Sequence, residues 1–162
     1  MRIILIIFLL IPTYLFAASD SEIVDQLLEP YNLECSAETG DVKLGEVISE
    51  IVPVTVDSGS VYEIKITASG KKATVLFSDF TCPGHGNYWC GSSGCDVYII
   101  IDGISYQTRG WKPFVVKEGE EVFVMLPKSG GACGLHNGGP CYSVAVWDES
   151  ENTFNTISDL LR

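Results

Sequence analysis

Six cysteines constrain the fold of this chain more than any other feature of its sequence. Whether they form disulfides depends on the compartment, and the N-terminus indicates export. Met1 and Arg2 give a short positive start, nine unbroken apolar residues follow at 3–11, and Ala17 and Ala18 come later. This is the layout of a secretory signal peptide cleaved after residue 17 or 18. Nine apolar residues are about half of the roughly 20 that span a bilayer, so we expect no membrane anchor after cleavage.

In a periplasmic or secreted chain, an even number of cysteines predicts disulfides rather than free thiols. Spacing favours two short-range bridges. Cys90 and Cys95 are five residues apart, and Cys133 and Cys141 are eight apart. Each pair encloses glycine-rich sequence that bends easily and lets its ends meet.

The third bridge would then join Cys35 to Cys82 and tie the N-terminal segment to the rest of the protein.

Zinc is the alternative interpretation of these thiols, together with His85 and His136. Structural zinc sites use two ligand pairs spaced about two to four residues apart, and this chain does not have two such pairs. Oxidation would also prevent Cys133 from acting as a nucleophile with His136 as its base.

Charge restricts the partners that such a chain can bind. It has 10 Lys and Arg against 21 Asp and Glu, a net charge of -11, and loss of residues 1–18 removes one positive residue and leaves -12. Nucleic acids and anionic membrane surfaces need a cationic face, so we exclude both and expect a cationic partner. With 46% hydrophobic residues, the mature chain, 19–162, has enough apolar material for one folded domain.

A short helix is expected at the start of the mature chain. Ser19 and Glu22 have the spacing of a capping box, Pro30 predicts the helix end, and one apolar face would be formed by Ile23, Val24, Leu27 and Leu28. Residues 42–56 fit either helix or strand, and Pro53 followed by Val-Thr-Val favours a strand.

Strands are expected through the remainder of the chain. Residues 62–66 alternate between apolar and polar, and residues 73–77 read as a strand covered on both sides. Asp102-Gly103 between two β-rich runs predicts a hairpin with a type I′ turn. Two further hairpins are predicted for residues 114–116 with 121–126 and 142–147 with 153–157. The expected fold is mainly β, an antiparallel sandwich or curled sheet with one N-terminal helix.

Two cysteine loops are the candidate working parts. Residues 81–95 and 128–141 each contain Cys-Gly, a histidine and several glycines, and each leads into a predicted strand. A loop that a disulfide holds rigid can present side chains to a partner, although disulfides often only secure a loop. The candidate binding residues are His85, Tyr88, Trp89, Leu135, His136 and Asn137.

Nothing in the sequence supports an enzyme. It has no nucleophile motif and no phosphate-binding glycine motif. Carboxylates are plentiful, but sequence alone pairs none of them, among them Asp79, Asp96, Asp102, Glu118 and Asp148. Two alternatives to a protein-binding domain stay open: a purely structural envelope protein, and a glycan-binding module that stacks sugars on Trp89, Trp111 and neighbouring aromatics.

The cysteine loops also resemble those of a group of uncharacterised exported proteobacterial proteins. Those proteins share a Cys, a Phe/Trp-Cys-Gly-x-x-Gly-Cys segment and an Ala-Cys-Gly segment before a last Cys. The matching elements here are Cys82, residues 89–95, and residues 132–134 with Cys141. The resemblance implies export and disulfides, and the group has no established activity. Many members have a calcium-like acidic loop, whereas residues 67–72 have no carboxylate, so we expect no cofactor.

A second resemblance is to periplasmic lysozyme inhibitors. Those inhibitors hold a histidine in a short cysteine-bracketed loop that leads into a strand ending in an apolar-Trp step. Residues 133–141 with His136, followed by residues 144–147 ending in Trp147, are similar to that arrangement, with a longer loop. The resemblance implies a partner that is a cationic hydrolase, which agrees with the acidic charge of this chain.

Overall fold

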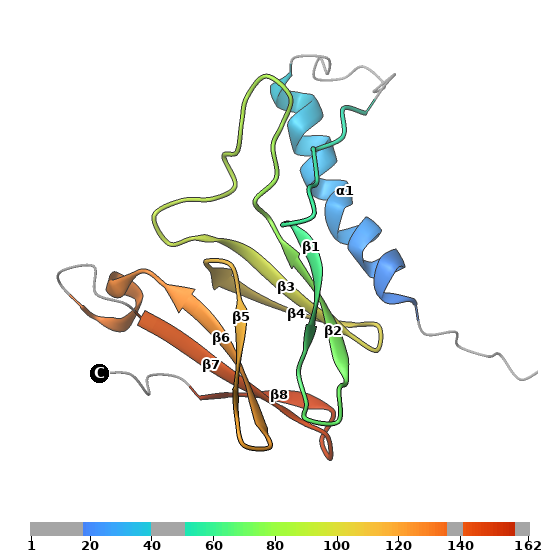
Figure 1. The fold of residues 1–162 in the computed structure, drawn as a ribbon. Coiled ribbons are helices and arrows are strands. Elements are labelled where there is room, and N and C mark those ends of the chain that lie inside the picture. The colour runs from blue at the N-terminus through green and yellow to red at the C-terminus, as the bar shows by residue number, and fades with distance from the viewer. Residues whose placement is uncertain (1–17, 40–50, 136–140, 158–162) are drawn as a thin grey trace, which may run out of the picture.

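The computed structural model describes residues 18–39, 51–135 and 141–157 (Figure 1). One long helix comes first and eight strands follow, with a short 3-10 helix before the seventh. The elements are α1 (Asp20–Glu38), β1 (Val61–Lys65), β2 (Lys72–Phe77), β3 (Cys95–Ile101), β4 (Ile104–Gly110), β5 (Phe114–Glu118), β6 (Glu121–Lys128), η1 (Gly130–Cys133), β7 (Cys141–Asp148) and β8 (Thr153–Ile157).

The strands form two antiparallel sheets, each a simple meander. Sheet 1 has the order β1-β2-β3-β4, and sheet 2 has the order β5-β6-β7-β8. The two sheets stack on each other, and α1 lies along the other face of sheet 1, so that sheet 1 is the middle of three layers (Figure 1). This confirms the predicted mainly β fold and selects the sandwich over the single curled sheet.

The two sheets repeat the same register. Their third strands, β3 and β7, both begin with a cysteine. The residue three positions after that cysteine is Tyr98 in β3, which pairs with Leu76, and Val144 in β7, which pairs with Met125. Positions in one sheet can therefore be matched to positions in the other by counting from the cysteine.

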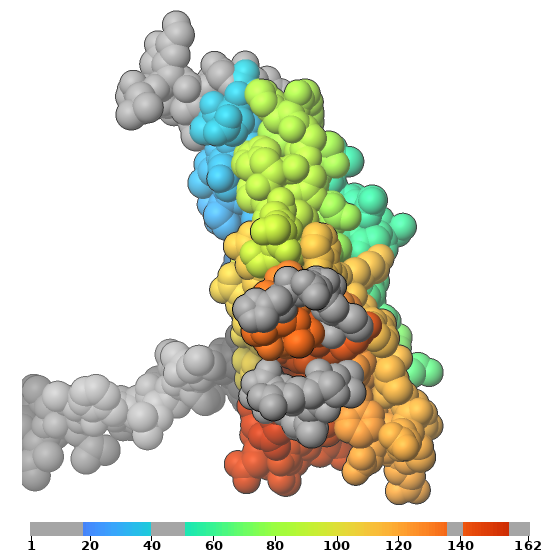
Figure 2. Space-filling model, turned by 90° about the vertical axis from the view of Figure 1, so that its left-hand side faces the viewer, coloured from blue at the N-terminus to red at the C-terminus, as the bar shows by residue number. Residues whose placement is uncertain are grey.

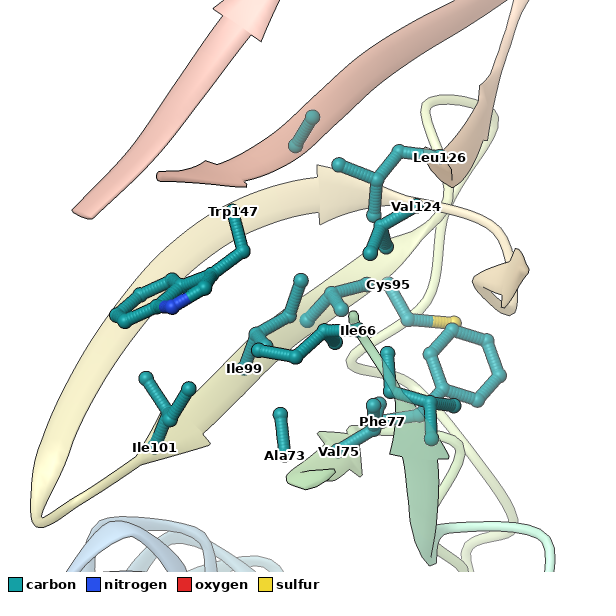
Figure 3. Packing of buried hydrophobic residues seen from close by; sticks show 13 residues of the cluster. Ile66, Ala73, Val75, Phe77, Cys95, Ile99, Ile101, Val124, Leu126 and Trp147 are labelled. Carbon is teal, nitrogen blue, oxygen red and sulfur yellow. The ribbon is translucent and has the colours of Figure 1, made fainter. Parts of the chain in front are cut away.

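The main core lies between the two sheets (Figure 3). Alternate residues of each strand point into it, as the period of two requires. Sheet 1 contributes Ile66, Val75, Val97 and Ile99, and sheet 2 contributes Val124, Leu126, Ala145 and Trp147.

A second core lies between α1 and the outer face of sheet 1. Leu76 and Ile100 are fully buried there against Tyr31 and Cys35 of the helix and Phe80 of the following loop. Because residues 73–77 face both cores, the strand is covered on both sides, as predicted.

The helix begins as predicted but does not end at Pro30. The Ser19 side chain accepts from the Glu22 backbone N–H and the Glu22 carboxylate accepts from the Ser19 N–H, which completes the capping box. Proline removes one helical hydrogen bond at a cost of about 3 kcal/mol. The prediction was wrong because the second half of α1 is held from outside by burial of Tyr31 and by the Cys35–Cys82 disulfide.

The predicted hairpins are present. The described part of the strand predicted at 42–56 does not form a strand. Asp102 and Gly103 have φ of 50° and 78°, as a type I′ turn requires, between β3 and β4. Of the predicted strand at 42–56, the described part, 51–56, has no ladder and only a single bridge from Thr55 to Thr81. This stretch instead runs beside α1, where the Ser36 hydroxyl accepts from the backbone N–H of Val52.

Candidate functional site

Three disulfides close the loops that the sequence singled out. They join Cys35 to Cys82, Cys90 to Cys95, and Cys133 to Cys141, and all three pairings were predicted. Three disulfides are compatible with an oxidising compartment outside the cytosol. A potential metal-binding group in the described part of the chain is Asp79 with Cys90 and Cys95, and the bridge between these sulfurs removes them as thiolate ligands.

The two short disulfide loops arise at the same end of the sandwich. Cys95 pairs with Gly110 at the end of β4, and Cys141 pairs with Lys128 at the end of β6. Gly110 links the two sheets, because a Cβ atom there would lie 2.6 Å from the carbonyl oxygen of Pro127. In Figure 2, the green segment before β3 lies next to the orange part of the chain that contains β6 and η1. We call this the disulfide end, and the opposite end, formed by the hairpin turns, the turn end.

Trp89 fixes the first loop from inside. It is 8% exposed and packs edge-on against Tyr31 and Phe80. Its indole N–H donates to the Glu34 carboxylate at 2.7 Å, and its carbonyl accepts from the Arg109 guanidinium at 3.1 Å. Trp89 was predicted to contact a partner. Its burial in the α1 core makes it a support for the loop instead, with its ring inaccessible for sugar stacking.

The candidate binding residues of the first loop that are exposed are His85 and Tyr88. The His85 backbone N–H donates to the Cys82 carbonyl at 3.0 Å, and its side chain is exposed. The Tyr88 ring is 37% exposed and rests on Trp89 with 4.2 Å between centroids. Partial burial, and then the charges of Glu34 and Glu38, raise the pKa of Tyr88, so its hydroxyl stays a hydrogen-bond donor at neutral pH.

The second loop is described up to residue 135. After η1, Gly134 adopts the left-handed conformation with φ of 71°, and the Leu135 N–H donates to the Gly130 carbonyl at 2.9 Å. Leu135 is 37% exposed. The other two candidates of this loop, His136 and Asn137, lie outside the described residues.

Trp111 adds a third exposed group at the disulfide end. It follows Gly110 directly, is 43% exposed, and is held by a hydrogen bond from its backbone N–H to the Pro127 carbonyl at 2.8 Å. The sequence offered Trp111 only as part of a sugar platform, and the structure places it at the disulfide end. The candidate contact residues described and exposed at this end are His85, Tyr88, Trp111 and Leu135.

Negative charge lies mainly on helix α1 and at the turn end, and Glu34 and Glu38 at the end of α1 bring part of it beside the first loop. Helix α1 has no basic residue and six acidic ones, and the turn end adds further carboxylates around β5–β6 and β7–β8. The disulfide end, by contrast, includes Arg109, Lys112 and Lys128. The acidic residues therefore set the long-range field, and the exposed groups named above would make the short-range contacts.

Four of the five carboxylates considered as catalytic candidates have structural partners. Asp96 accepts from the Tyr31 hydroxyl at 3.2 Å, and Asp102 pairs with Lys71 at 2.7 Å. Asp79 accepts from the Asn87 amide, and Asp148 accepts from Ser150. These contacts account for the positions of the four carboxylates by turn and strand packing.

The fold and the disulfide end define a class: a disulfide-linked β-sandwich with two loops closed at one edge. No family model, curated protein or solved structure matches the chain. In the part of the chain that the structure describes, no helix has the length and apolar character needed to cross a membrane.

Proposed function

We propose that this protein is an exported, non-enzymatic binding module whose contact surface is the disulfide end. The observation that supports this most is the convergence of the two loops. The disulfides Cys90–Cys95 and Cys133–Cys141 close loops that start β3 and β7, and Gly110 brings these strand ends together. A single partner can therefore touch both loops at once.

The first loop is held by its own contacts before binding, which favours affinity. Ordering a flexible side chain at an interface costs about 0.5–1.5 kcal/mol, and a preformed surface avoids much of that cost. In the first loop, the side-chain oxygen Oδ1 of Asn87 accepts from the backbone N–H groups of both Trp89 and Cys90, at 3.1 and 3.2 Å. Trp89 then holds Tyr88 outward against its own ring.

The partner that fits best is a cationic protein, most concretely a cell-wall hydrolase of the muramidase type. The acidic helix α1 and the turn end attract a cationic protein and raise its encounter rate, and the attraction reaches further at low salt because the Debye length is longer there. Contact itself would be made by Tyr88, Trp111 and Leu135, whose side chains suit an apolar cleft wall. The periplasm is the compartment in which such an inhibitor meets that enzyme.

The test is a cell-wall lysis assay with purified mature protein and a cationic muramidase, together with calorimetric titration of the two proteins. We expect lysis to slow as the protein is added, and Tyr88→Ala combined with Trp111→Ala to weaken binding about tenfold or more. The matched control is Ile104→Ala, because Ile104 is 51% exposed but lies at the turn end. Undiminished lysis at excess protein, with no heat of binding, would contradict the proposal.

One observation favours a glycan as the second candidate ligand. Trp111 is 43% exposed beside the two loops, and a free indole face can stack on a sugar ring. Burial of Trp89 weakens this alternative, because it leaves a single tryptophan at this surface. Tryptophan fluorescence that stays constant across a panel of cell-wall oligosaccharides would exclude it.

A further inference from the structure

The space between the two sheets is not filled evenly. A cavity of about 420 Å³ lies between β4 of sheet 1 and β6, β7 and β8 of sheet 2. Its walls include the core residues Ile99, Leu126 and Ala145 and the more polar Tyr106, Lys128 and Ser143. Pockets that bind small organic ligands have volumes of about 300–1,000 Å³, so this cavity can admit one.

The cavity has a cause in the sequence of β7. Each third strand begins with a cysteine, and residues at the same distance from it can be matched. Ser143 and Ala145 of β7 then match Val97 and Ile99 of β3. Both pairs of positions face the other sheet, and β7 has the smaller side chain at each. The missing side-chain volume leaves space beside Ile99, in the cavity that Leu126 and Ala145 also line.

Two fixed contacts keep this space open at a constant width. At the disulfide end, Gly110 lies directly against Pro127, so that the sheets are pinned backbone to backbone. Towards the turn end, the Tyr106 hydroxyl donates to the Asn152 carbonyl at 3.2 Å, and its ring packs against Phe154 at 5.1 Å. The cavity lies between these contacts, along the edge strands β4 and β8.

A lysine reaches this cavity from an inward-facing position. Along β6, Val122, Val124 and Leu126 point into the core, and Lys128 continues the same phase at the end of the strand. Its stem lies beside Gly110, with Cγ 3.7 Å from where a Cβ would be. Among the described residues, the bases that form ion pairs are Lys71, Lys72 and Arg109, so the Lys128 ammonium is available to a ligand.

We propose that this cavity binds a single-chain amphiphile with an anionic headgroup, such as a fatty acid. The hydrocarbon chain would lie among Ile99, Leu126 and Ala145, and the carboxylate would meet the Lys128 ammonium, with the Ser143 hydroxyl beside the same wall. The net negative charge of the protein opposes anions at long range. The headgroup would lie beside Lys128 at the disulfide end, away from the carboxylates of the turn end.

The experiment is calorimetric titration of the full mature protein with dodecanoate, below its micelle concentration, and with dodecanol as the uncharged probe of equal chain length. We expect both to bind and dodecanoate to bind more tightly. Lys128→Gln should weaken dodecanoate binding about tenfold or more and change dodecanol binding little, because a charge-assisted contact is worth about 1.5–3 kcal/mol. The matched control is Lys65→Gln, an exposed lysine on β1 of sheet 1, which should change neither.

A second variant tests the cavity itself. Ala145→Leu adds the side-chain volume that β7 lacks and should abolish binding of both probes, with a thermal unfolding midpoint close to the original. Failure of the original protein to bind either probe would overturn the proposal, and so would equal losses in Lys128→Gln and Lys65→Gln. If Ala145→Leu does not fold, the two lysine variants decide alone. None of these outcomes depends on the muramidase assay, which tests the disulfide end.

Discussion

Sheets 1 and 2 have the same strand order, the same register and the same cysteine at the start of the third strand, yet their outer faces differ. Leu76 of sheet 1 is fully buried under α1, whereas its counterpart in sheet 2, Met125, is half-buried. Phe114 and Val116 at the edge of sheet 2 are 43% and 41% exposed, and the Phe114 ring contacts Tyr142 of the same sheet. One meander therefore serves as an inner layer and the other as a surface layer.

The inner faces of the two sheets differ in the size of their side chains. Sheet 1 presents large side chains, Val97 and Ile99, to the space between the sheets, and sheet 2 presents Ser143 and Ala145 at the matching positions. Sheet 1 thus supplies most of the apolar contact in both cores, and sheet 2 supplies the cavity. We therefore expect sheet 1 and α1 to supply most of the stability of the fold and sheet 2 to supply the binding surface.

The largest expected effect concerns the disulfides. The Cys35–Cys82 bridge closes a separation of 47 residues, and the Cys133–Cys141 bridge closes one of 8. In the chain-entropy model these loops are worth about 4 and about 2.6 kcal/mol. Replacing both cysteines of the long bridge with alanine should therefore lower the free energy of unfolding more than the same change in the short one. Urea denaturation of the two double variants measures the free energy of unfolding, and equal decreases would contradict the larger effect expected for the long bridge.

The next effect concerns matched positions on the two outer faces. Leu76→Ala should cost about 2–5 kcal/mol, because it leaves a cavity between α1 and sheet 1. Met125→Ala should cost about 1 kcal/mol or less, since the side chain is partly in water already. The measurement is again the free energy of unfolding in urea. A larger loss for Met125→Ala would show that something covers sheet 2 in solution.

A smaller effect should appear at alkaline pH. Burial, followed by the hydrogen bond with Tyr98 and the charge of Asp96, raises the pKa of Tyr31 well above the usual 10.0. The unfolded chain then releases its proton first, so this contribution to stability is complete below pH 10.0 and is lost as the pH rises further. Tyr31→Phe should lower stability by about 1–3 kcal/mol at neutral pH and reduce its alkaline decline.

Tyr62 is the matched control for that experiment. Burial raises the pKa of Tyr62 to about 12, at the other side of sheet 1, where its hydroxyl donates to the Pro113 carbonyl. Tyr62→Phe should therefore change the alkaline decline less than Tyr31→Phe does. Chemical denaturation at a series of pH values separates the two, and identical profiles would contradict the assignment.

The smallest effect is expected in acid. The Ser150 hydroxyl, and then the backbone N–H groups of Glu151 and Ser150, hold the pKa of Asp148 below the usual 3.8. Its contribution to stability is present above pH 3.8 and is lost as the pH falls through the lowered value. Asp148→Asn keeps an acceptor oxygen in the turn and should show less acid destabilisation. Urea midpoints at neutral pH and below pH 3.8 measure the difference.

Much of the fold was predictable because the signals were local. The Asp102-Gly103 turn, the capping box at Ser19 and the apolar alternation of the strands each act over a few residues. The two errors, at Pro30 and at residues 51–56, arose where tertiary contacts outweigh local preference. The burial of Tyr31 and the disulfide of Cys35 are long-range, so no local pattern could show that the helix continues.

The candidate site was predictable in part. Cysteine spacing gave all three bridges, and the exposure expected of His85 and Tyr88 is present. Trp89 was misassigned because its burial depends on the distant residues Tyr31 and Glu34. The inward position of Lys128 was visible as the continuation of the Val122, Val124 and Leu126 alternation, but the sequence could not show which side of β6 faces a cavity.

The disulfide at the first residue of β3 makes the loop before that strand a suitable place for inserted peptides. The segment between Cys82 and Asn87 projects from a base that is tied at Cys82 to α1 and through Cys90 to the start of β3. Peptides inserted there should lengthen the loop without shifting the ladder, at an entropic cost of about 0.6 kcal/mol for each doubling of length. The molecule is thus a promising carrier for grafted epitopes or affinity sequences.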